Sequence, residues 1–351
     1  MRFGKMVVMD VGAANTVAGI AGRGVVLREP AAIMLQAQTK RILATGNDAW
    51  NALERTPENI VALRPLSRGI GGCDPDVLAG MLRYQLTNVC RQNFFLCQPG
   101  VLFAVPSCTT AYERQMLADA SYIGSLPGLK AGCVKRRVAL VDETLAHAVG
   151  MGLWRRKGYS AALVVGARCC QAAIFADGEL ALSRCVHSRT PILGAGGDAL
   201  DAAVAEFFAR ECGLIVGTEY AERIKRSVGA SAATAVDVVS PPGCKLSAAQ
   251  VAEGTRAAMS APLARLVAMF GELLEDAARE LGDAAVSEIA SCGVMLSGGG
   301  AQLKGLRAML GDKFKMEFAL AERPLDSAAE GMLEMVASGR IPALPVKEGA
   351  K

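Results

Sequence analysis

The stretch 6-MVVMDVGAANTVAGIAG-22 reads as a buried strand, a tight turn and a second strand that leaves the turn directly. Because a strand follows the glycine, the turn is neither a Walker loop nor a Rossmann fingerprint, which both need a helix there. Gly12 permits the turn, Asn15 and Thr16 offer side-chain donors, and Asp10 can hold a hydrated Mg²⁺ ion. Taken alone, the stretch fits an ordinary hairpin turn better than a phosphate loop.

A related unit follows much later, at 160-SAALVVGARCCQAAIF-175. Both units belong to regions of short strands separated by glycine turns, residues 6–35 and 161–188. The second turn carries an arginine and two cysteines in place of small polar residues. An internal duplication is the simplest account of the repeat, and it predicts two similar domains that face each other.

Length and composition favour a folded protein of two domains. The chain has 351 residues, of which 52% are hydrophobic, so a large core is expected and disorder is not. No apolar run approaches the roughly 20 residues of a membrane span. Asp10 also comes too early for a signal peptide, so a cytosolic protein is expected.

The net charge argues against nucleic acid as a partner, and the cysteine spacing argues against a zinc site. Lys and Arg number 38 against 34 Asp and Glu, and this net charge of +4 is too small to indicate nucleic acid. The basic runs 135-KRR-137 and 154-WRRK-157 are expected to be solvated faces, with attraction to a membrane surface as the alternative. Eleven cysteines without a CxxC pair, and only two histidines, argue against zinc and favour buried free thiols.

Amphipathic helices are expected between and after the strand regions. Residues 74–92 begin with an Asp cap and a proline in the first turn. Residues 109–124 begin with a capping box, and residues 197–213 form a strongly amphipathic helix. The side chains predicted to face the core are Val77, Leu78, Met81, Leu82, Leu86, Leu200, Val204, Phe207 and Phe208.

The C-terminal half is predicted to be mostly helical. Residues 246–282 read as a helix in two parts, broken near Pro262. A strand at 292–300 leads into a helix at 301–310, and the tail 342–351 is expected to be loose.

Three further motifs support a phosphate or sugar site. Gly196-Gly197-Asp198 stands at a helix start. In 221-AERIKRSVG-229, Glu222 and Lys225 are three residues apart, so both lie on one side of a helix, where a surface ion pair is the alternative. In 297-SGGGAQLKGL-306, three glycines precede a predicted helix N-terminus, which suits an anion or a ribose.

Taken in order along the chain, these motifs resemble the MreB family of bacterial actin homologues. The resemblance implies an α/β actin/Hsp70-like ATPase fold, in which two RNase-H-like domains form a cleft for ATP or ADP with Mg²⁺. It also implies self-assembly into filaments on the cytoplasmic face of the cell membrane, contact with cell-wall elongation membrane proteins, and a role in cell shape. The matching segments are DVGAANT, EPAAIML, TPENIVALRPLSRGI, VPSCTTAYERQML, ETLAHAVGMGL, GGDALDAAV, GTEYAERIKRSVG, LSGGGAQLKGL and ERPLDSAAEGMLEM.

The resemblance also implies domain boundaries and site residues. The first domain is expected at 1–142, with a small subdomain at about 32–66 and a C-terminal return at about 322–341. The second is expected at 143–321, with a small subdomain at about 191–251, before a flexible tail at 342–351. The nucleotide-binding residues implied are Asp10 (also holding the metal through water), Gly12, Ala13, Ala14, Asn15, Thr16, Gly166, Ala167, Arg168, Gly196, Gly197, Asp198, Glu222, Arg223, Ile224, Lys225, Gly298, Gly299, Gly300 and Ala301.

The second hairpin departs from the family pattern Asp-Ile-Gly-Gly-Gly-Thr-Thr-Glu. Val164 stands in place of the acid that helps to hold metal-bound water, and Cys169 and Cys170 replace hydroxyls with weaker hydrogen-bonding thiols. Ala13, in the first hairpin, stands where threonine is common. Arg168 either offers its guanidinium to the phosphates or turns outward and leaves the loop without a ligand.

Glu113 matches the family position that orients or activates the attacking water, although its place in the capping box also explains it. With this glutamate kept and the metal acid lost, slow or absent hydrolysis is expected. Thr144 replaces a proline of the family pattern. His147 stands where alanine is usual, and a lone helical histidine is expected to be a packing residue.

Phe94, Phe95 and Leu96 match a family loop that dips into the bilayer, with a buried apolar staple as the alternative. Two other functions stay open: an Hsp70-like or sugar-kinase-like ATPase, and a non-polymerising regulator that retains the actin fold.

Overall fold

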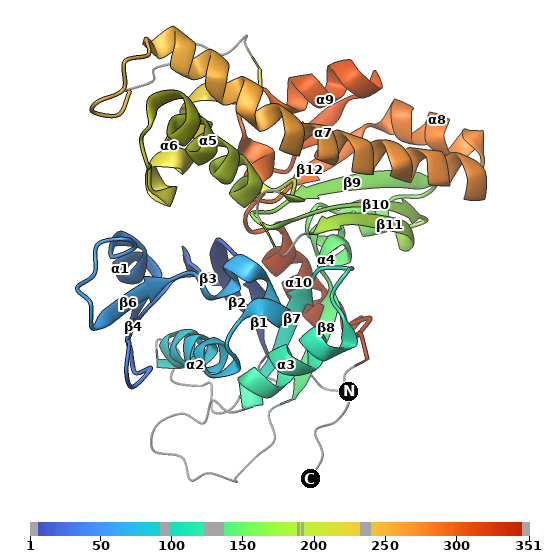
Figure 1. Cartoon of the computed structure of the whole chain (residues 1–351). Helices are drawn as coiled ribbons and strands as arrows, with labels where there is room; N and C mark the ends of the chain where they lie inside the picture. The colour runs from blue at the N-terminus through green and yellow to red at the C-terminus, as the bar shows by residue number, and fades with distance from the viewer. Residues whose placement is uncertain are drawn as a thin grey trace. The chain divides into compact units, whose positions relative to one another are not determined.

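The computed structural model describes residues 6–91, 99–122, 137–187, 190, 193–231 and 240–345. The chain divides into two compact units, Met1–Gly150 with Asp326–Lys351, and Met151–Leu325. In Figure 1 the chain begins in the first unit in blue, passes through the second in green to orange, and returns to the first in red.

The first unit contains a five-stranded sheet in the order β3-β2-β1-β7-β8. Strand β1 pairs antiparallel with β2 and parallel with β7, and β7 pairs parallel with β8. The turn between β1 and β2 therefore lies at the same edge of the sheet as the carboxyl ends of β7 and β8. The strands are β1 (Met6–Val11), β2 (Asn15–Ile20), β3 (Gly24–Pro30), β7 (Gly100–Val105) and β8 (Val138–Asp142).

Alternating residues of β1 belong to two separate cores, one on each face of this sheet. Val7 and Met9 pack in a cluster with side chains of α2 (Pro75–Arg91) and α3 (Ala111–Tyr122). Met6 and Val8 pack with side chains of α4 (Glu143–Gly150) and α10 (Ser327–Ser338). The predicted inward face of residues 74–92 is confirmed, because all five of its named apolar side chains are buried.

Helices α4 and α10 cross at two glycines. A Cβ atom on Gly331 would lie 1.8 Å from the Ala146 carbonyl oxygen, and one on Gly150 would lie 2.0 Å from the Ser327 carbonyl oxygen. This contact holds residues 143–150 in the first unit, so the boundary expected after residue 142 is wrong.

The C-terminal segment that belongs to the first unit begins at Asp326, the residue before α10, and Asp326 is hydrogen-bonded to strand β3. Arg28 on β3 donates two hydrogen bonds to its carboxylate, each 2.7 Å long, and Asp326 is itself buried. A paired guanidinium and carboxylate of this geometry orients both groups.

A small three-stranded sheet in the order β5-β4-β6 completes the first unit, within the residues expected to form a subdomain. Its elements are β4 (Ile33–Gln36), β5 (Ile42–Thr45), α1 (Gly46–Asn51) and β6 (Ile60–Leu63).

The second unit repeats the five-stranded arrangement, with the order β11-β10-β9-β12-β13. Strand β9 pairs antiparallel with β10 and parallel with β12, as β1 does with β2 and β7. The two sheets therefore share strand order and direction, as the repeated hairpin unit predicts. The strands are β9 (Tyr159–Val165), β10 (Cys169–Ala176), β11 (Glu179–His187), β12 (Val294–Ser297) and β13 (Phe318–Leu320).

The helices of this unit share one large core with its sheet. Leu200, Val204, Phe207 and Phe208 are buried in it, as predicted. The helices are α5 (Gly197–Cys212), α6 (Thr218–Val228), α7 (Ala248–Glu280), α8 (Asp283–Cys292) and α9 (Leu306–Phe314).

Helix α7 runs unbroken through Pro262, so the predicted division into two parts is wrong. Met259, Leu263 and Leu266 are buried on either side of the proline, and this packing offsets the hydrogen bond that proline cannot donate. Among the described residues, α7 is also the one helix long and apolar enough to cross a membrane, a test that a core helix passes too.

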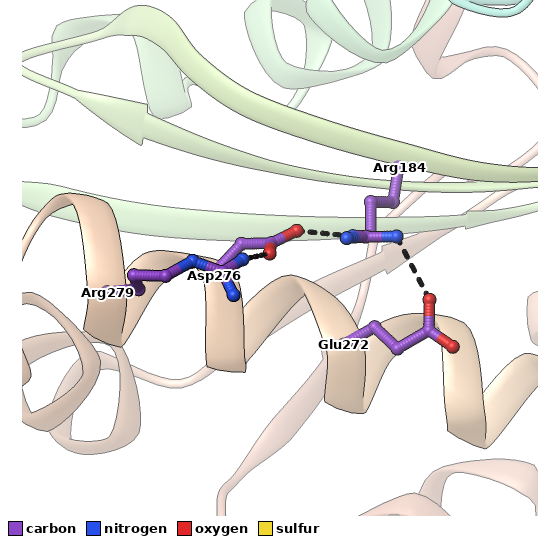
Figure 2. Close-up of polar contacts among 4 residues, drawn as sticks. All are labelled: Arg184, Glu272, Asp276 and Arg279. Carbon is purple, nitrogen blue, oxygen red and sulfur yellow. Dashed lines mark hydrogen bonds and ion pairs between the residues drawn. The ribbon is translucent and has the colours of Figure 1, made fainter.

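An ionic network joins α7 to the edge strand β11 (Figure 2). Arg184 on β11 donates from Nη1 to Glu272, at 3.0 Å, and from Nε to Asp276. Asp276 also accepts from Arg279 of its own helix. Arg184 holds the pKa of the Asp276 carboxyl below its usual range.

Two other expectations are wrong in detail. The helix expected at 301–310 begins only at Leu306, because a 3-10 turn at Gly299–Gln302 and a positive φ of 78° at Gly305 come first. The tail is not loose at its start, since the Leu344 N–H donates to the Leu140 carbonyl at 2.7 Å. Residues 346–351 lie outside the described part of the chain.

Candidate functional site

The first hairpin turn lies at the carboxyl edge of its sheet. The Gly12 N–H donates to the Asn15 carbonyl at 3.0 Å, and Val11 pairs with Thr16 to close the turn. A Cβ atom on Gly12 would lie 2.9 Å from the Asn15 oxygen, which explains why glycine stands there.

Asp10 precedes this turn on β1 and is half-buried. Burial raises the pKa of its carboxyl from 3.8 to about 7, because a buried carboxylate loses hydration. An acid at this position is therefore poised to lose its proton when a cation approaches.

Arg64 braces the same turn from the small sheet, and sequence reasoning missed it. Its Nε and Nη2 both donate to the Ala13 carbonyl, at 3.1 and 2.9 Å. Its guanidinium also lies over the Trp50 ring, 6.0 Å from the centroid. The sequence offers one signal for Arg64: it lies within TPENIVALRPLSRGI, a segment that matches the family pattern.

The other turn residues differ in accessibility. Asn15 is exposed, and the Ala14 carbonyl accepts from the Ala31 N–H at 2.8 Å. Thr16 is fully buried, and its hydroxyl accepts from the Gln85 amide at 3.1 Å. Thr16 thus supports the hairpin from beneath, whereas Asn15 faces outward.

Glu113 forms the predicted capping box with Thr110. One carboxylate oxygen accepts from the Thr110 N–H at 2.9 Å, and the Glu113 N–H donates to the Thr110 hydroxyl at 3.2 Å. The other carboxylate oxygen accepts from the Gly71 N–H at 3.2 Å. The side chain is therefore held in place, as a residue that positions a water must be.

Asp142, at the end of β8, organises the neighbouring turn. Its carboxylate accepts from the Ser107 hydroxyl at 2.7 Å, from the Leu145 N–H at 3.0 Å and from the Thr144 hydroxyl. Thr144, which replaces a proline of the family pattern, therefore supplies a hydrogen bond where proline would supply only a fixed φ angle. His147, three residues after Thr144 on α4, is buried, and burial lowers the pKa of its imidazole to about 4, so it is neutral at pH 7.

The second hairpin has the same turn geometry as the first. The Gly166 N–H donates to the Cys169 carbonyl at 3.0 Å, and Val165 pairs with Cys170. The registers therefore align Val164 with Asp10, and Val164 is a core residue that is 1% exposed. Arg168 is buried, so its side chain does not turn out into solvent.

The start of α5 donates to this hairpin. The Gly197 N–H bonds the Gly166 carbonyl at 3.0 Å, and the Asp198 N–H bonds the Ala167 carbonyl at 2.7 Å. Two of the first amides of α5 are thus already satisfied within the protein, and in this arrangement they are not offered to an anion.

Lys225 of helix α6 also lies at the start of α5. Lys225 pairs with Asp201 of α5 at 2.8 Å and donates to the Gly197 carbonyl at 3.3 Å. Burial raises the pKa of Asp201 to about 6, against the opposing effect of Lys225. The neighbouring Ile224 is buried in the core of the second unit.

The two charged residues flanking this lysine have partners of their own. Glu222 pairs with Arg226 at 2.7 Å, and Arg223 lies over the Tyr220 ring at 4.7 Å. The alternative of a surface ion pair between Glu222 and Lys225 is therefore wrong, because Lys225 pairs with Asp201 instead.

The glycine segment at the end of β12 packs on β9. Gly298 has a φ of 84°, and a Cβ atom there would lie 2.6 Å from the Val165 carbonyl oxygen. A Cβ atom on Gly300 would lie equally close to the Val165 side chain, and Ala301 is buried. The structure thus gathers the hairpin 166–168, the start of α5, Lys225 and this segment at one edge of the second sheet.

A family model described as "MreB/Mbl protein" matches residues 4–341. The chain belongs to the MreB/Mbl family. The cell shape-determining protein MreB of Escherichia coli (strain K12) is 30% identical over 347 residues, which cover 93% of each chain. The cell shape-determining protein Mbl of Bacillus subtilis (strain 168) is 28% identical over 342 residues, covering 94% of this chain and 95% of the relative.

Solved structures show the same fold as this MreB/Mbl family member. MreB 5 of Spiroplasma citri bound to AMPPNP has a TM-score of 0.78 at 19% identity, covering 96% of this chain and 97% of its own. A non-polymerising MamK mutant bound to AMPPNP has a TM-score of 0.61 at 13% identity. The predicted α/β actin-like fold is confirmed.

One predicted surface falls outside the described residues. Phe94, Phe95 and Leu96 lie in the undescribed segment 92–98, so the expected membrane loop stays a prediction from sequence.

Proposed function

We propose that this MreB/Mbl protein is a cell shape-determining cytoskeletal protein that binds an adenine nucleotide. The observation that carries the proposal is the pair of hairpins, each with the same glycine turn at the carboxyl edge of its sheet. The relatives named above are cell shape-determining proteins, and the Spiroplasma citri structures are bound to AMPPNP or ADP.

In this proposal the nucleotide contacts are those that the family resemblance implies, taken for each unit by itself. Backbone amides of the first hairpin contact phosphate oxygens, with the turn kept in shape by Arg64. Lys225, Glu222 and the segment Gly298–Ala301 contact the sugar and the base from the second unit. Lys225 then exchanges part of its contact with Asp201 and Gly197 for the ligand.

Magnesium fits the first hairpin better than the second. Asp10 is a half-buried carboxyl with a raised pKa, which suits a metal-bound water, whereas its counterpart Val164 is an apolar core residue. When bound, Mg²⁺ neutralises charge on the phosphates. With one carboxylate instead of two, metal binding is weakened, and we propose that hydrolysis is slow or lost although Glu113 is retained.

Phosphate release from ATP in the presence of Mg²⁺ tests this proposal. We expect release well below that of an MreB relative that has the second acid, measured side by side at equal protein concentration. Turnover at the relative's rate would show that Val164 does not limit the reaction.

The cytoskeletal part of the proposal requires assembly of many copies. Head-to-tail contacts between copies build an open filament when the rotation between neighbours does not close into a ring. Sedimentation with and without ATP, followed by negative-stain imaging, should show filaments. Protein that stays monomeric under every nucleotide condition would favour the non-polymerising regulator.

The site of assembly in this proposal is the cytoplasmic face of the cell membrane. Its support is the apolar run Phe94-Phe95-Leu96, since each buried aromatic contributes about 2 kcal/mol and a polymer multiplies weak contacts. Liposome co-sedimentation should be lost in Phe94→Ser/Phe95→Ser. Tyr112→Ser, which removes an exposed aromatic from α3, is the matched control and should bind as wild type does. Unchanged binding of the double variant would exclude this run as the anchor.

A further inference from the structure

Two cysteine sulfurs of the second unit lie in contact. The Sγ atoms of Cys212 and Cys244 are 3.1 Å apart, and one thiol hydrogen-bonds to the other. Cys212 is the last residue of α5, and Cys244 lies just before Ser247, the residue that caps α7. Both cysteines are partly exposed and have exposed neighbours in the sequence, so small reagents reach them.

The backbone on both sides holds these sulfurs together. Beyond Cys212 the chain turns at Gly213, and the Leu214 N–H returns to the Phe208 carbonyl at 3.1 Å. On the other side, the Cys244 N–H donates to the Pro241 carbonyl at 3.0 Å, which closes a turn around Gly243. A Cβ atom on Gly243 would lie 3.6 Å from the Leu214 side chain, so the two turns are near neighbours. The contact between the sulfurs therefore follows from ordered elements on each side.

A disulfide bond needs little rearrangement from this starting point. Its S–S length of about 2 Å is about 1 Å shorter than the present distance, a movement within reach of side-chain rotation. The bond would close a ring that contains all of α6, including Glu222 and Lys225. The ring would tie the end of α5 to the start of α7.

We propose that Cys212 and Cys244 form a modification site at which a low-molecular-weight disulfide, such as oxidised glutathione, introduces a reversible intramolecular disulfide. The Cys244 thiolate attacks one sulfur of the small disulfide, whose S–S bond breaks and releases the first small thiol. The Cys212 sulfur then loses its proton and attacks the Cys244 sulfur of the mixed disulfide, which releases the second small thiol. Two protein thiols are oxidised, one small disulfide is reduced, and the two protons end on the two small thiols.

The order of attack follows from the environment of Cys212. Burial, with a smaller effect of the neighbouring Cys244, raises the pKa of the Cys212 thiol to about 11. Cys212 therefore keeps its proton at pH 7 and can donate it to the Cys244 sulfur, which leaves Cys244 as the first nucleophile.

Peptide mapping of the whole chain tests the proposal. The folded protein is treated with oxidised glutathione, its remaining thiols are alkylated, and its tryptic peptides are identified by mass spectrometry. We expect a linked Cys212–Cys244 peptide that lacks two hydrogens and disappears after dithiothreitol. Cys212→Ser should abolish the link and leave a glutathione adduct on Cys244. Cys292→Ser, which removes an exposed cysteine at the end of α8, should leave the link unchanged.

Two results would overturn the proposal. One is recovery of Cys212 and Cys244 as alkylated thiols, or as separate glutathione adducts, under conditions that oxidise other cysteines. The other is equal formation of the link in urea-unfolded protein, which would show that the folded geometry plays no part.

Discussion

The raised pKa of the Asp10 carboxyl makes the stability of the folded protein depend on pH. Its pKa rises from 3.8 in the unfolded chain to about 7 on burial, so between these values the folded protein holds a proton that the unfolded chain releases. The free energy of unfolding therefore falls as pH rises from about 4 to about 7. Asp10→Asn cannot titrate, and it should gain on the order of 4 kcal/mol relative to wild type across that window, at about 1.4 kcal/mol for each pKa unit.

Urea unfolding of both proteins at intervals from pH 4 to pH 8 measures this difference. The two curves should diverge through the window and run parallel above pH 8. Curves that stay parallel throughout would mean that Asp10 titrates normally and is well hydrated.

Arg64 is predicted to position the phosphate turn without touching the phosphates. Arg64→Ala removes both hydrogen bonds to the Ala13 carbonyl, so the turn loses its preferred shape. We expect the affinity for ATP to fall about tenfold, equivalent to about 1.4 kcal/mol, in a titration with a fluorescent ATP analogue. Arg41→Ala, which removes an exposed arginine just before strand β5 of the small sheet, is the control and should bind normally. Equal ATP affinities for the two variants would show that Arg64 does not position the phosphate turn.

At the scale of elements, the crossing of α4 and α10 depends on glycine. Gly331→Ala would place a methyl group 1.8 Å from the Ala146 carbonyl oxygen, so the helices must separate. We expect a loss of about 3 kcal/mol in the free energy of unfolding, measured by denaturant titration.

Gly271→Ala provides the matched control for this substitution. Its added methyl group would meet only the Phe314 ring, at 3.8 Å, inside helix α7. It should be neutral or stabilise by about 0.5–1 kcal/mol, as alanine does within helices. A Gly331→Ala variant as stable as this control would contradict the close crossing.

Periodicity and turn chemistry were sufficient to predict most elements. The hairpin regions, the helix that begins at Pro75 and its buried face, and the capping box at Thr110 all follow from local patterns. Pro262 misled the prediction because packing on both sides keeps α7 continuous. The assignment of α4 to the wrong domain has a similar cause, since nothing local to residues 143–150 indicates their fit against Gly331.

At the scale of the whole molecule, the repeated strand region predicted two similar domains, because each repeat specifies the same three consecutive antiparallel strands. The candidate site was less accessible to sequence reasoning. The amides of Gly197 and Asp198 hydrogen-bond to the second hairpin, and Lys225 pairs with Asp201. Both contacts join segments that are distant in the sequence. The sequence offers no local signal for either.

We propose that this protein holds an adenine nucleotide with the first hairpin as its main phosphate contact. Isothermal titration of the folded wild-type chain with ATP in the presence of Mg²⁺ tests it most directly. We expect saturable binding of one ATP per chain, and marked weakening when Gly12→Val distorts the turn. Absence of any heat of binding to a folded wild-type protein, or equal binding by the Gly12→Val variant, would contradict it.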